Sequence, residues 1–512
     1  MFKNHPKGLL GAALSNMGER FGFYIMMAIL LLFLEFKFDF VGTPYGGLIY
    51  SVFYALIYVL ALVGGLIADR TKNYKSTITI GIVLMMIGYA VIAWPTPTPA
   101  PNKTITLIIT CLGLFAIAFG NGLFKGNLQA VVGQLYDNPE YSDKRDTGFQ
   151  IFYMFINVGA MFAPLLAVGL RNWVVSSQGY AFNEDLPALC NEYLSNGAAM
   201  TQEAMARFTL LASEVGNKLP NLADFAKDYL NVFVTGYHYS FAIAILAMLI
   251  SFVIFMTNKN KLPNPADKSI NRSQAAEIVE MSAAEIKQRI YALFAVFGVV
   301  IFFWFSFHQN GVTLTKFAND YTRLDGMVLD LGFTVLKGAE LFQSFNPFFV
   351  VCLTPIVIGL FGWLKARGKE PSTPKKIGIG MGIAAIAFVV MALGSYGLPS
   401  TQERIAEGGL NPALRVTPWL LIGTYFILTV AELFISPLGL SFVSKVAPPQ
   451  YQGIMQGAWL SATAVGNQLL FIGTILYNNI PIWATWTVFV VACLLSMGTM
   501  LAMVKWLERV TK

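Results

Sequence analysis

The 512-residue chain is poor in charge, histidine and cysteine. Charged residues make up 12% of it and hydrophobic residues 56%, with 3 His and 4 Cys. A soluble chain would carry about a quarter of its residues as Asp, Glu, Lys and Arg. The composition therefore excludes a soluble enzyme, a nucleic-acid-binding protein and a disordered chain. Three of the four cysteines lie in apolar runs, and no CxxC or HxxxH spacing occurs, so we expect neither a disulfide framework nor a metal site.

The chain contains many long apolar runs. A helix needs about 20 apolar residues to cross a bilayer, and twelve nearly charge-free stretches are long enough. The sequence thus predicts an all-α integral membrane protein with 12 transmembrane helices. The stretches lie near residues 9–36, 45–68, 77–94, 104–124, 148–170, 239–257, 290–317, 340–364, 377–397, 416–440, 453–477 and 482–506.

The basic residues indicate the orientation of these helices. An even number of spans puts both termini on one side, and 22 of the 35 Lys and Arg residues belong to that side. Because cytoplasmic loops are enriched in Lys and Arg, we expect both termini in the cytoplasm and the protein in the inner (cytoplasmic) membrane. The formal net charge of +7 then reflects topology rather than an acidic partner.

Two polar segments divide the chain. Residues 258–288 predict a cytoplasmic linker, with a short amphipathic helix over 274–288 capped by Ser273, between a six-helix bundle at 1–257 and another at 289–512. Residues 171–237 predict an extracytoplasmic insertion of two or three short helices. Thr201 and Asn221 are expected N-caps there, since Thr and Asn side chains accept hydrogen bonds from first-turn amides.

Away from the polar loops, we assign four charged residues to the membrane interior: Glu19, Arg20 and Glu432 within predicted spans, and Lys125 directly after the stretch at 104–124. Each costs at least about 2.5 kcal/mol at a helix centre. Two acids and two bases sum to zero, so they either pair to hold helices together or line a polar cavity between the halves. The spread over three spans favours a route for a polar or charged substrate.

His308 lies within the run FFWFSFHQNG, in a predicted span. A buried histidine either is neutral and hydrogen-bonded or accepts a proton in a coupling cycle. Polar and aromatic residues accompany the charges, and for any one of them packing or an interfacial position is the alternative to a binding role. They are Tyr24, Tyr54, Tyr58, Asn157, Gln309, Asn310, Asn346 and Trp459.

Several segments in both halves resemble the proton-dependent oligopeptide transporter family of the major facilitator superfamily. The first span resembles the family's ExxERFxYY, and the loop after the second resembles the superfamily's GxxxDR. Together the matches cover the chain apart from 171–237. The segments are NMGERFGFY (16–24), GGLIADR (64–70), GNGLFKGN (120–127), FYMFINVGAMFAP (152–164), FQSFNP (342–347), KEPSTPKK (369–376) and AELFISPLGLSFVSKVAP (431–448).

The resemblance implies a proton-coupled symporter that imports di- and tripeptides by alternating access, with no cofactor besides the proton, working as a monomer in the lipid bilayer. It implies that Arg20 and Lys125 attract the peptide carboxylate and that Glu432 takes the ammonium. The remaining implied roles are backbone binding for Tyr24, Tyr58 and Asn157, a side-chain pocket for Trp459 with Asn346 nearby, and a charge lock for Asp69 and Arg70. For proton coupling our hypothesis is that protons enter by titration of Glu19, with His308 as an added or substitute site.

The chain departs from the family pattern at positions tied to proton coupling. Asn16 replaces the first Glu of the motif, Met27 replaces a common arginine, and residues 290–317 contain no Asp or Glu. Two alternatives therefore accompany the symporter: a carrier of another small solute, such as a nitrate-like anion or an amphipathic compound, and a non-transporting membrane sensor. Glu432 argues against a simple anion, which has no ammonium to meet it. No nucleophile–base pair or phosphate loop indicates an enzyme.

Overall fold

The computed structural model describes residues 4–40, 45–181, 183, 186–197, 200–216, 219–263, 281–311, 313–323, 328–330, 335–337, 342, 344–406, 410 and 412–510. Within them the chain is helical except for one short antiparallel hairpin, β1 (Val328–Asp330) and β2 (Val335–Lys337), in which Leu329 pairs with Leu336. The predicted all-α fold is confirmed. Its first helices are α1 (Gly8–Phe38), α2 (Tyr45–Thr71), α3 (Tyr74–Ala93), α4 (Lys103–Gln134), α5 (Arg145–Ser177), α6 (Leu186–Asn196), α7 (Gln202–Glu214) and α8 (Leu222–Asn258).

The later helices follow the predicted linker. They are α9 (Ala283–Phe307), α10 (Thr313–Tyr321), α11 (Phe345–Ala366), α12 (Thr373–Gly394), α13 (Thr401–Ala406), α14 (Pro418–Leu433), α15 (Ser436–Val446), α16 (Gln452–Gln468), α17 (Leu470–Asn479) and α18 (Ile482–Val510). Among the described residues, ten helices are long and apolar enough to cross a membrane, and α1, bent by 48°, makes an eleventh. The remaining predicted span, 453–477, is the pair α16 and α17, which is broken at Leu469.

Breaks in the helices change the bounds of two predicted spans, whose regions still hold the membrane-length segments Ala283–Asn310 and Pro418–Val446. The span at 290–317 ends as α9 at Phe307, and a 3₁₀ turn over His308–Gly311 leads into α10. The span at 416–440 divides into α14 and α15 just before Pro437. Proline lacks an amide hydrogen and its ring clashes with the preceding turn, so a helix tends to break there.

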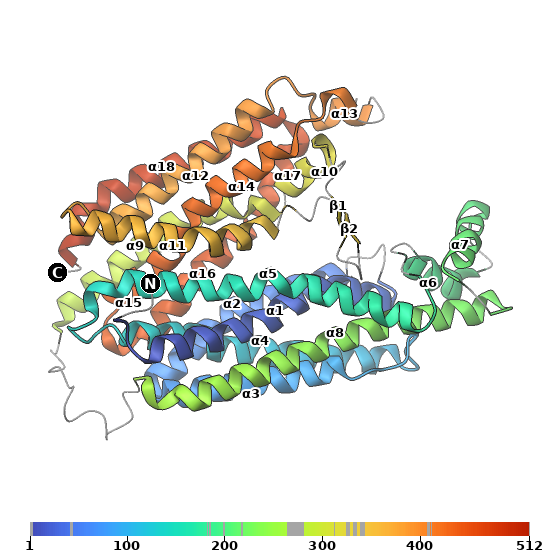
Figure 1. Cartoon of the computed structure of the whole chain (residues 1–512), viewed down its shortest axis with the longest axis horizontal. Helices are drawn as coiled ribbons and strands as arrows, with labels where there is room; N and C mark the ends of the chain where they lie inside the picture. The colour runs from blue at the N-terminus through green and yellow to red at the C-terminus, as the bar shows by residue number, and fades with distance from the viewer. Residues whose placement is uncertain are drawn as a thin grey trace.

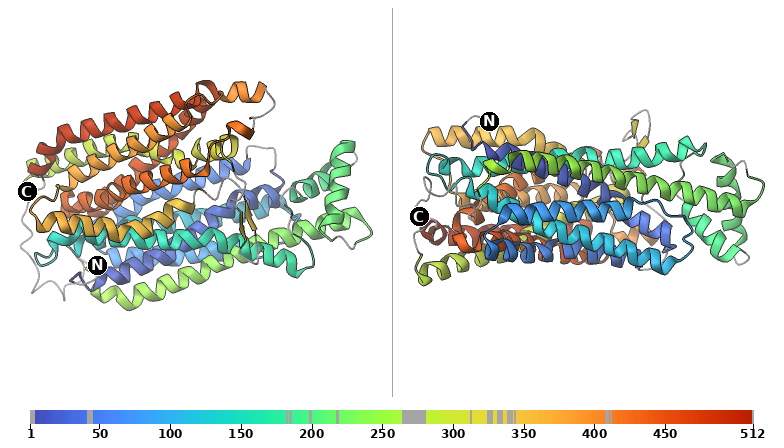
Figure 2. Two further views of the ribbon diagram at one scale, coloured as in Figure 1. Left: turned by 45° about the horizontal axis from the view of Figure 1, so that its top comes forward. Right: turned by 90° about the horizontal axis from the view of Figure 1, so that it is seen from below.

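The helices form two groups, which we call the first group (α1–α8) and the second group (α9–α18) (Figure 1). In the first, α1 packs on α5 and α8, and α4 packs on α2 and α3; in the second, α12 packs on α14 and α18, and α9 packs on α16 and α18. Figure 2 shows both termini at one end of the molecule and α6 and α7 at the other. The division at 258–288 stays a prediction, because 264–280, with Ser273 and the first part of the expected linker helix, lie outside the described residues. The last part of that expected helix is the start of α9, which Ser282 caps.

Close approach of backbones holds the first group together. A Cβ atom at Gly64 of α2 would lie 2.1 Å from the carbonyl oxygen of Gly122 in α4. Small residues let membrane helices pack with their backbones in contact, where apolar burial alone gives little driving force between helices.

The insertion is shorter than the predicted 171–237, because the spanning helices extend into it. Helix α5 continues to Ser177, and α8 begins at Leu222, so that the expected second short helix is the start of α8. Both predicted caps are confirmed: the Thr201 side chain accepts from the Ala204 amide, and the Asn221 side chain accepts from the Ala223 amide.

Candidate functional site

Glu19 and Arg20 lie side by side on α1 and form a closed, bidentate ion pair. The Arg20 Nε and Nη2 atoms donate to the two carboxylate oxygens of Glu19, each at 2.6 Å. Asn121 of α4 donates a third hydrogen bond, 2.6 Å from its Nδ2 to Glu19 Oε1. All three residues are almost fully buried. The Glu19 carboxylate is therefore satisfied within the first group, and Arg20 is bound to it.

Lys125 of α4 is a partly buried cation near this pair. Its Nζ lies 5.0 Å from the centre of the Tyr58 ring, a cation–π contact. Within the described part of the chain it forms no ion pair, although it lies close enough to Glu19 and Arg20 for their charges to act on it. Tyr58 in turn contacts Tyr54, with their hydroxyls 3.4 Å apart. Lys125 thus presents an ammonium group that no carboxylate neutralises directly.

Glu432 of α14 is the buried acid of the second group. Its two oxygens accept from the Tyr153 hydroxyl of α5, which belongs to the first group, and from Asn346 Nδ2 of α11 at 2.6 Å. Asn346 also donates to Thr429 at 3.1 Å. Both donors to Glu432 are neutral, so its negative charge, like the positive charge of Lys125, has no direct counter-ion among the described residues.

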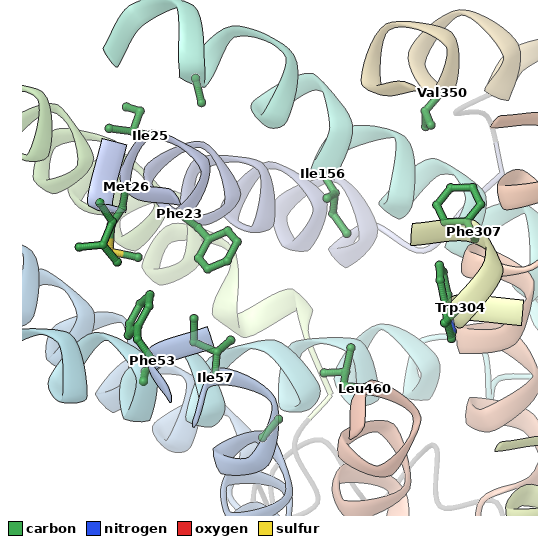
Figure 3. Packing of buried hydrophobic residues seen from close by; sticks show 14 of the residues in the cluster. Phe23, Ile25, Met26, Phe53, Ile57, Ile156, Trp304, Phe307, Val350 and Leu460 are labelled. Carbon is green, nitrogen blue, oxygen red and sulfur yellow. The ribbon is translucent and has the colours of Figure 1, made fainter. Parts of the chain in front are cut away.

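Tyr24 is close enough to both Arg20 and Glu432 for their charges to act on its hydroxyl. Apolar side chains surround the region, and Figure 3 shows them coming from both groups of helices. They include Phe23 of α1, Ile57 of α2, Ile156 of α5, Trp304 of α9 and Leu460 of α16. In such apolar surroundings an electrostatic interaction is stronger than it is in water.

Two other expected site residues are engaged in local packing. The Asn157 amide donates to the Tyr153 carbonyl of its own helix at 3.1 Å. Trp459 of α16 is buried against Phe297, and its ring lies so close to Gly439 of α15 that a Cβ atom there would be 2.1 Å away. The helices that carry them, α5 and α16, each contact the other group, α5 through α11 and α15 and α16 through α2 and α4.

His308 lies at the end of α9 rather than in the middle of a span. Its ring stacks on Trp304, with centroids 4.8 Å apart, and its Nδ1 is hydrogen-bonded to Oδ1 of Asn467 in α16. It is not the sole buried histidine in the spans, since His238 of α8 is 2% exposed and bonded to the Ile92 carbonyl. The predicted span at 239–257 began too late to include His238.

Asp69 joins the two groups at the end where the termini lie. Its carboxylate accepts from the Tyr74 hydroxyl and from the amides of Gly453 and Ile454, at 2.9 and 2.8 Å. These are first-turn amides of α16, which have no acceptor inside their helix, and an anion there is favoured by the helix dipole. The expected Asp69–Arg70 lock is thus made by Asp69 with a helix N-terminus, and Arg70 is exposed.

A second set of contacts joins the groups at the same end. Asp146, at the start of α5, accepts from Lys376 and Thr373 of α12, at 3.0 and 2.9 Å, and from Ser441 of α15 at 2.6 Å. Arg145 donates to Ser444 at 2.9 Å. We call these contacts, together with those of Asp69, the inter-group network. In Figure 1 the two groups separate from this end toward α10 and the hairpin.

Sequence reasoning missed Asn121, Tyr153, Asn467 and Asp146. The first two stand in quoted motifs, GNGLFKGN and FYMFINVGAMFAP, but an uncharged side chain gives no signal of its own. The role of Asp146 depends on which helices meet at the termini, which the residue pattern does not contain. Among the described residues, no group of three or more His, Cys, Asp and Glu side chains is placed to hold a metal ion.

Two groups of membrane-length helices, with buried charges near their shared interface, define a membrane transporter of the major facilitator fold. A model of the POT family matches residues 75–279 and 264–486, and the chain belongs to that family. It is a multi-pass membrane transporter, not an enzyme, and the resemblance drawn from the sequence is confirmed.

Individual relatives match over nearly the whole chain. The peptide transporter YePEPT of Yersinia enterocolitica is 29% identical, covering 91% of this chain and 87% of the relative. A di-/tripeptide transporter of Lactococcus lactis is 27% identical, with 91% and 89% covered. A crystal structure of a POT family transporter in complex with a thioalcohol-conjugated peptide has the same fold, with a TM-score of 0.60, 21% identity, and 100% and 98% covered.

Proposed function

We propose that this chain is a proton-coupled symporter that imports di- and tripeptides by alternating access. The observation that carries the proposal is a pair of opposite charges, a partly buried cation and a buried anion, without a direct counter-ion among the described residues. Lys125 supplies the cation from the first group, and Glu432 supplies the anion from the second. A peptide zwitterion carries a carboxylate and an ammonium, which complement these two charges. The peptide-transporting relatives from Yersinia and Lactococcus support the same substrate class.

The other expected residues complete the site. Tyr24, Tyr58 and Asn157 would hydrogen-bond the peptide backbone, while Trp459 and Asn346 would border the side-chain pocket. Because the charged ends of one peptide contact both groups, binding would draw the groups together and favour an occluded state. Asp69, with Arg70 beside it, would hold the end at the termini closed while the substrate enters from the opposite end.

Proton coupling would act through Glu19. Its carboxylate holds Arg20 in a bidentate pair, and protonation would remove the charge that binds the guanidinium. Arg20 would then be available to the peptide carboxylate beside Lys125. His308, hydrogen-bonded to Asn467, is the additional or substitute proton site. The proton is the coupling ion, and no other cofactor is required.

The arrangement in the membrane follows from the basic loops. Both termini would lie in the cytoplasm, with the insertion containing α6 and α7 outside the inner membrane. One chain contributes both charged positions of the pathway, so the monomer would be the working unit. Membrane lipid and the peptide are the expected partners, and no nucleic acid is expected.

Uptake of labelled dialanine and trialanine into proteoliposomes tests the proposal. With an inward pH gradient, wild-type protein should accumulate both peptides, and a protonophore should abolish accumulation. The variants Lys125→Gln and Glu432→Gln should lose most uptake, whereas Lys505→Gln, at an exposed position near the carboxyl terminus, should not. Uptake unchanged by the protonophore would exclude a symporter. Competition by nitrate but not by dialanine would indicate the other-solute alternative, and failure of dipeptide counterflow would indicate a sensor.

A further inference from the structure

Residues 4–7, which we call the N-terminal segment, precede α1 and contact the connection between α4 and α5. His5 is half-buried, and its Nδ1 lies 2.7 Å from the Tyr136 hydroxyl, with the two rings edge to face. Lys144 donates to the Asn4 carbonyl of the same segment at 3.3 Å. The connection that the segment contacts leads directly into Arg145, a residue of the inter-group network.

Tyr136 determines which atom carries the proton in its contact with His5. Its side chain is fully buried and leaves no room for a Cβ atom at Gly148, so it lies directly on the first turn of α5. Among the described residues, no acceptor other than His5 lies within hydrogen-bond distance of its hydroxyl. A buried hydroxyl without an acceptor is costly, so Tyr136 donates and Nδ1 of a neutral imidazole accepts.

Tyr136 also contacts the inter-group network through its backbone. Its carbonyl accepts from Arg145 Nη2 at 2.9 Å, and the same nitrogen donates to Asp137 Oδ1 at 2.6 Å. The other terminal nitrogen of the guanidinium, Nη1, donates to Ser444 of the second group at 2.9 Å. A continuous series of contacts therefore runs from His5 to Ser444, across the interface of the two groups.

The surroundings of His5 disfavour its protonated form. Burial lowers the pKa of His5, and the charge of Lys144 lowers it further, whereas Asp143 acts in the opposite sense. Asp143 is itself paired with Lys365 at 2.9 Å. A released segment would have the ordinary histidine pKa of about 6.5, so the docked segment binds fewer protons than the released one. Docking is therefore strongest above about pH 6.5 and weakens as the pH falls below that value.

We propose that the N-terminal segment is a pH-sensitive latch, which protonation of His5 releases from Tyr136. Protonation turns Nδ1 from an acceptor into a donor, and the buried Tyr136 hydroxyl then has no acceptor. The segment detaches, and the contact between Arg145 and Ser444, which helps to join the two groups at this end, weakens. The end where the termini lie then opens more readily.

The consequence for transport rests on the proposed function, in which this end faces the cytoplasm. The state that is open to the outside requires this end to be closed. Release of the latch therefore reduces the population of that state. Import would slow as the protons that enter with the peptide acidify the cytoplasm.

Double electron–electron resonance tests the latch without peptide and without a pH gradient. Spin labels at Thr71 of α2 and Lys369 after α11, in a chain whose four cysteines are replaced by alanine, report the separation of the groups at this end. In nanodiscs the ratio of long to short distances should rise roughly fivefold between about pH 8 and about pH 5.5. His5→Gln keeps an acceptor for the Tyr136 hydroxyl but does not titrate, so its ratio should stay at the high-pH value throughout.

Nitrogen-15 NMR of histidine-labelled protein tests the protonation of His5 directly, since the chain has only three histidines. The resonances that disappear in His5→Gln belong to His5. They should show a neutral ring protonated at Nε2, which titrates below about pH 6.5. A ring protonated at Nδ1, or titration at or above that value, would overturn the proposal even if a variant folds poorly.

A matched variant separates the latch from the proposed coupling site. His308→Gln removes the histidine of that site and should keep the pH response of the distances. An equal response in His5→Gln, no response in the protein with His5 intact, or a response lost in His308→Gln instead would each overturn the latch. None of these measurements involves peptide uptake, so failure of the latch is distinguishable from failure of the proposed function.

Discussion

One hydrogen-bonded cluster contains Glu19, Arg20 and Asn121. Because Arg20 is bound within it, the cluster determines which cation is available to the substrate. The sequence offered Arg20 and Lys125 as equals for the peptide carboxylate. In the structure Arg20 is committed to Glu19 by two bonds of 2.6 Å, and Lys125 has no such commitment among the described residues. Lys125 is therefore the first contact for a carboxylate, and Arg20 becomes available only when Glu19 gives it up.

We expect Lys125 to bind the carboxylate end of a peptide and Glu432 to bind its ammonium end, and competition by modified peptides can test each contact separately. Dialanine amide lacks the carboxylate, so we expect it to compete for wild-type uptake roughly tenfold to hundredfold more weakly than dialanine. In Lys125→Gln this penalty should vanish, because the partner is already missing. N-acetyl-dialanine should behave in the same way with Glu432→Gln. Competition assays on the two variants complete the cycle, and a penalty that survives in both would show that these residues do not read the peptide ends.

Asn121 should help to hold the closed pair of Glu19 and Arg20. Its amide donates to the Glu19 carboxylate, so Asn121→Leu leaves this buried carboxylate with one donor fewer and should lower uptake of labelled dialanine roughly tenfold. Asn121→Gln, which keeps an amide donor, should restore uptake in part. Equal loss in the two variants would contradict a role for this hydrogen bond.

Breaks and close crossings in the helices determine where the site residues lie. Glu432 sits one turn before the break between α14 and α15, and His308 sits at the break after α9. The crossing of α2 and α4 at Gly64 brings Tyr58 to Lys125, which are one to two turns away on the same helices. The sequence predicts each of these segments as a continuous spanning helix. In the structure, the breaks and the close crossing determine where the polar side chains lie.

Gly64, where α2 crosses α4, should not tolerate a larger residue. Gly64→Ala would place a Cβ atom 2.1 Å from the Gly122 carbonyl oxygen, and the helices would have to separate. We expect a loss of about 1–3 kcal/mol in the free energy of unfolding, measured as a lower thermal midpoint in detergent. Gly298→Ala on α9, where nothing lies within 4 Å, is the matched control and should be neutral or slightly stabilising. Equal effects at both positions would contradict the close-crossing argument.

The whole molecule is joined by the inter-group network at the end where the termini lie, and its groups separate toward the other end (Figure 1). Alternating access requires that these bonds break when the opposite end closes. The network therefore sets the balance between the two states, and its acceptors Asp69 and Asp146 belong to the first group while most of its donors belong to the second.

Asp146→Asn should shift this balance toward opening at the termini. The change removes the charge that pairs with Lys376, which is 1% exposed, so the closed state loses a buried ion pair while Glu370 still holds the lysine. Spin labels at Thr71 and Lys369, in a chain whose four cysteines are replaced by alanine, should report a larger share of long distances. Glu285→Gln removes an ion pair to Arg289 within α9, outside the network, and should leave the distribution near wild type. No change in Asp146→Asn would show that the network does not hold the closed end.

The sequence by itself determined the class of protein, the family and most of the candidate site. Apolar runs fix which segments enter the bilayer, because water-free surroundings exclude charge, and the few charges left inside mark functional positions. Motif spacing identified Glu19, Arg20, Lys125 and Glu432 before any fold was known. Thr201 and Asn221 were likewise predictable as caps, since capping depends on residues within one turn.

Only the tertiary structure decided which of these groups meet. The sequence did not show that Arg20 is bound to Glu19. It did not show that the neutral donors Tyr153 and Asn346, from two other helices, surround Glu432. It also did not show that α9 ends just before His308. Hydrogen-bond partners form between faces that pack side by side, and a one-dimensional pattern does not encode that packing.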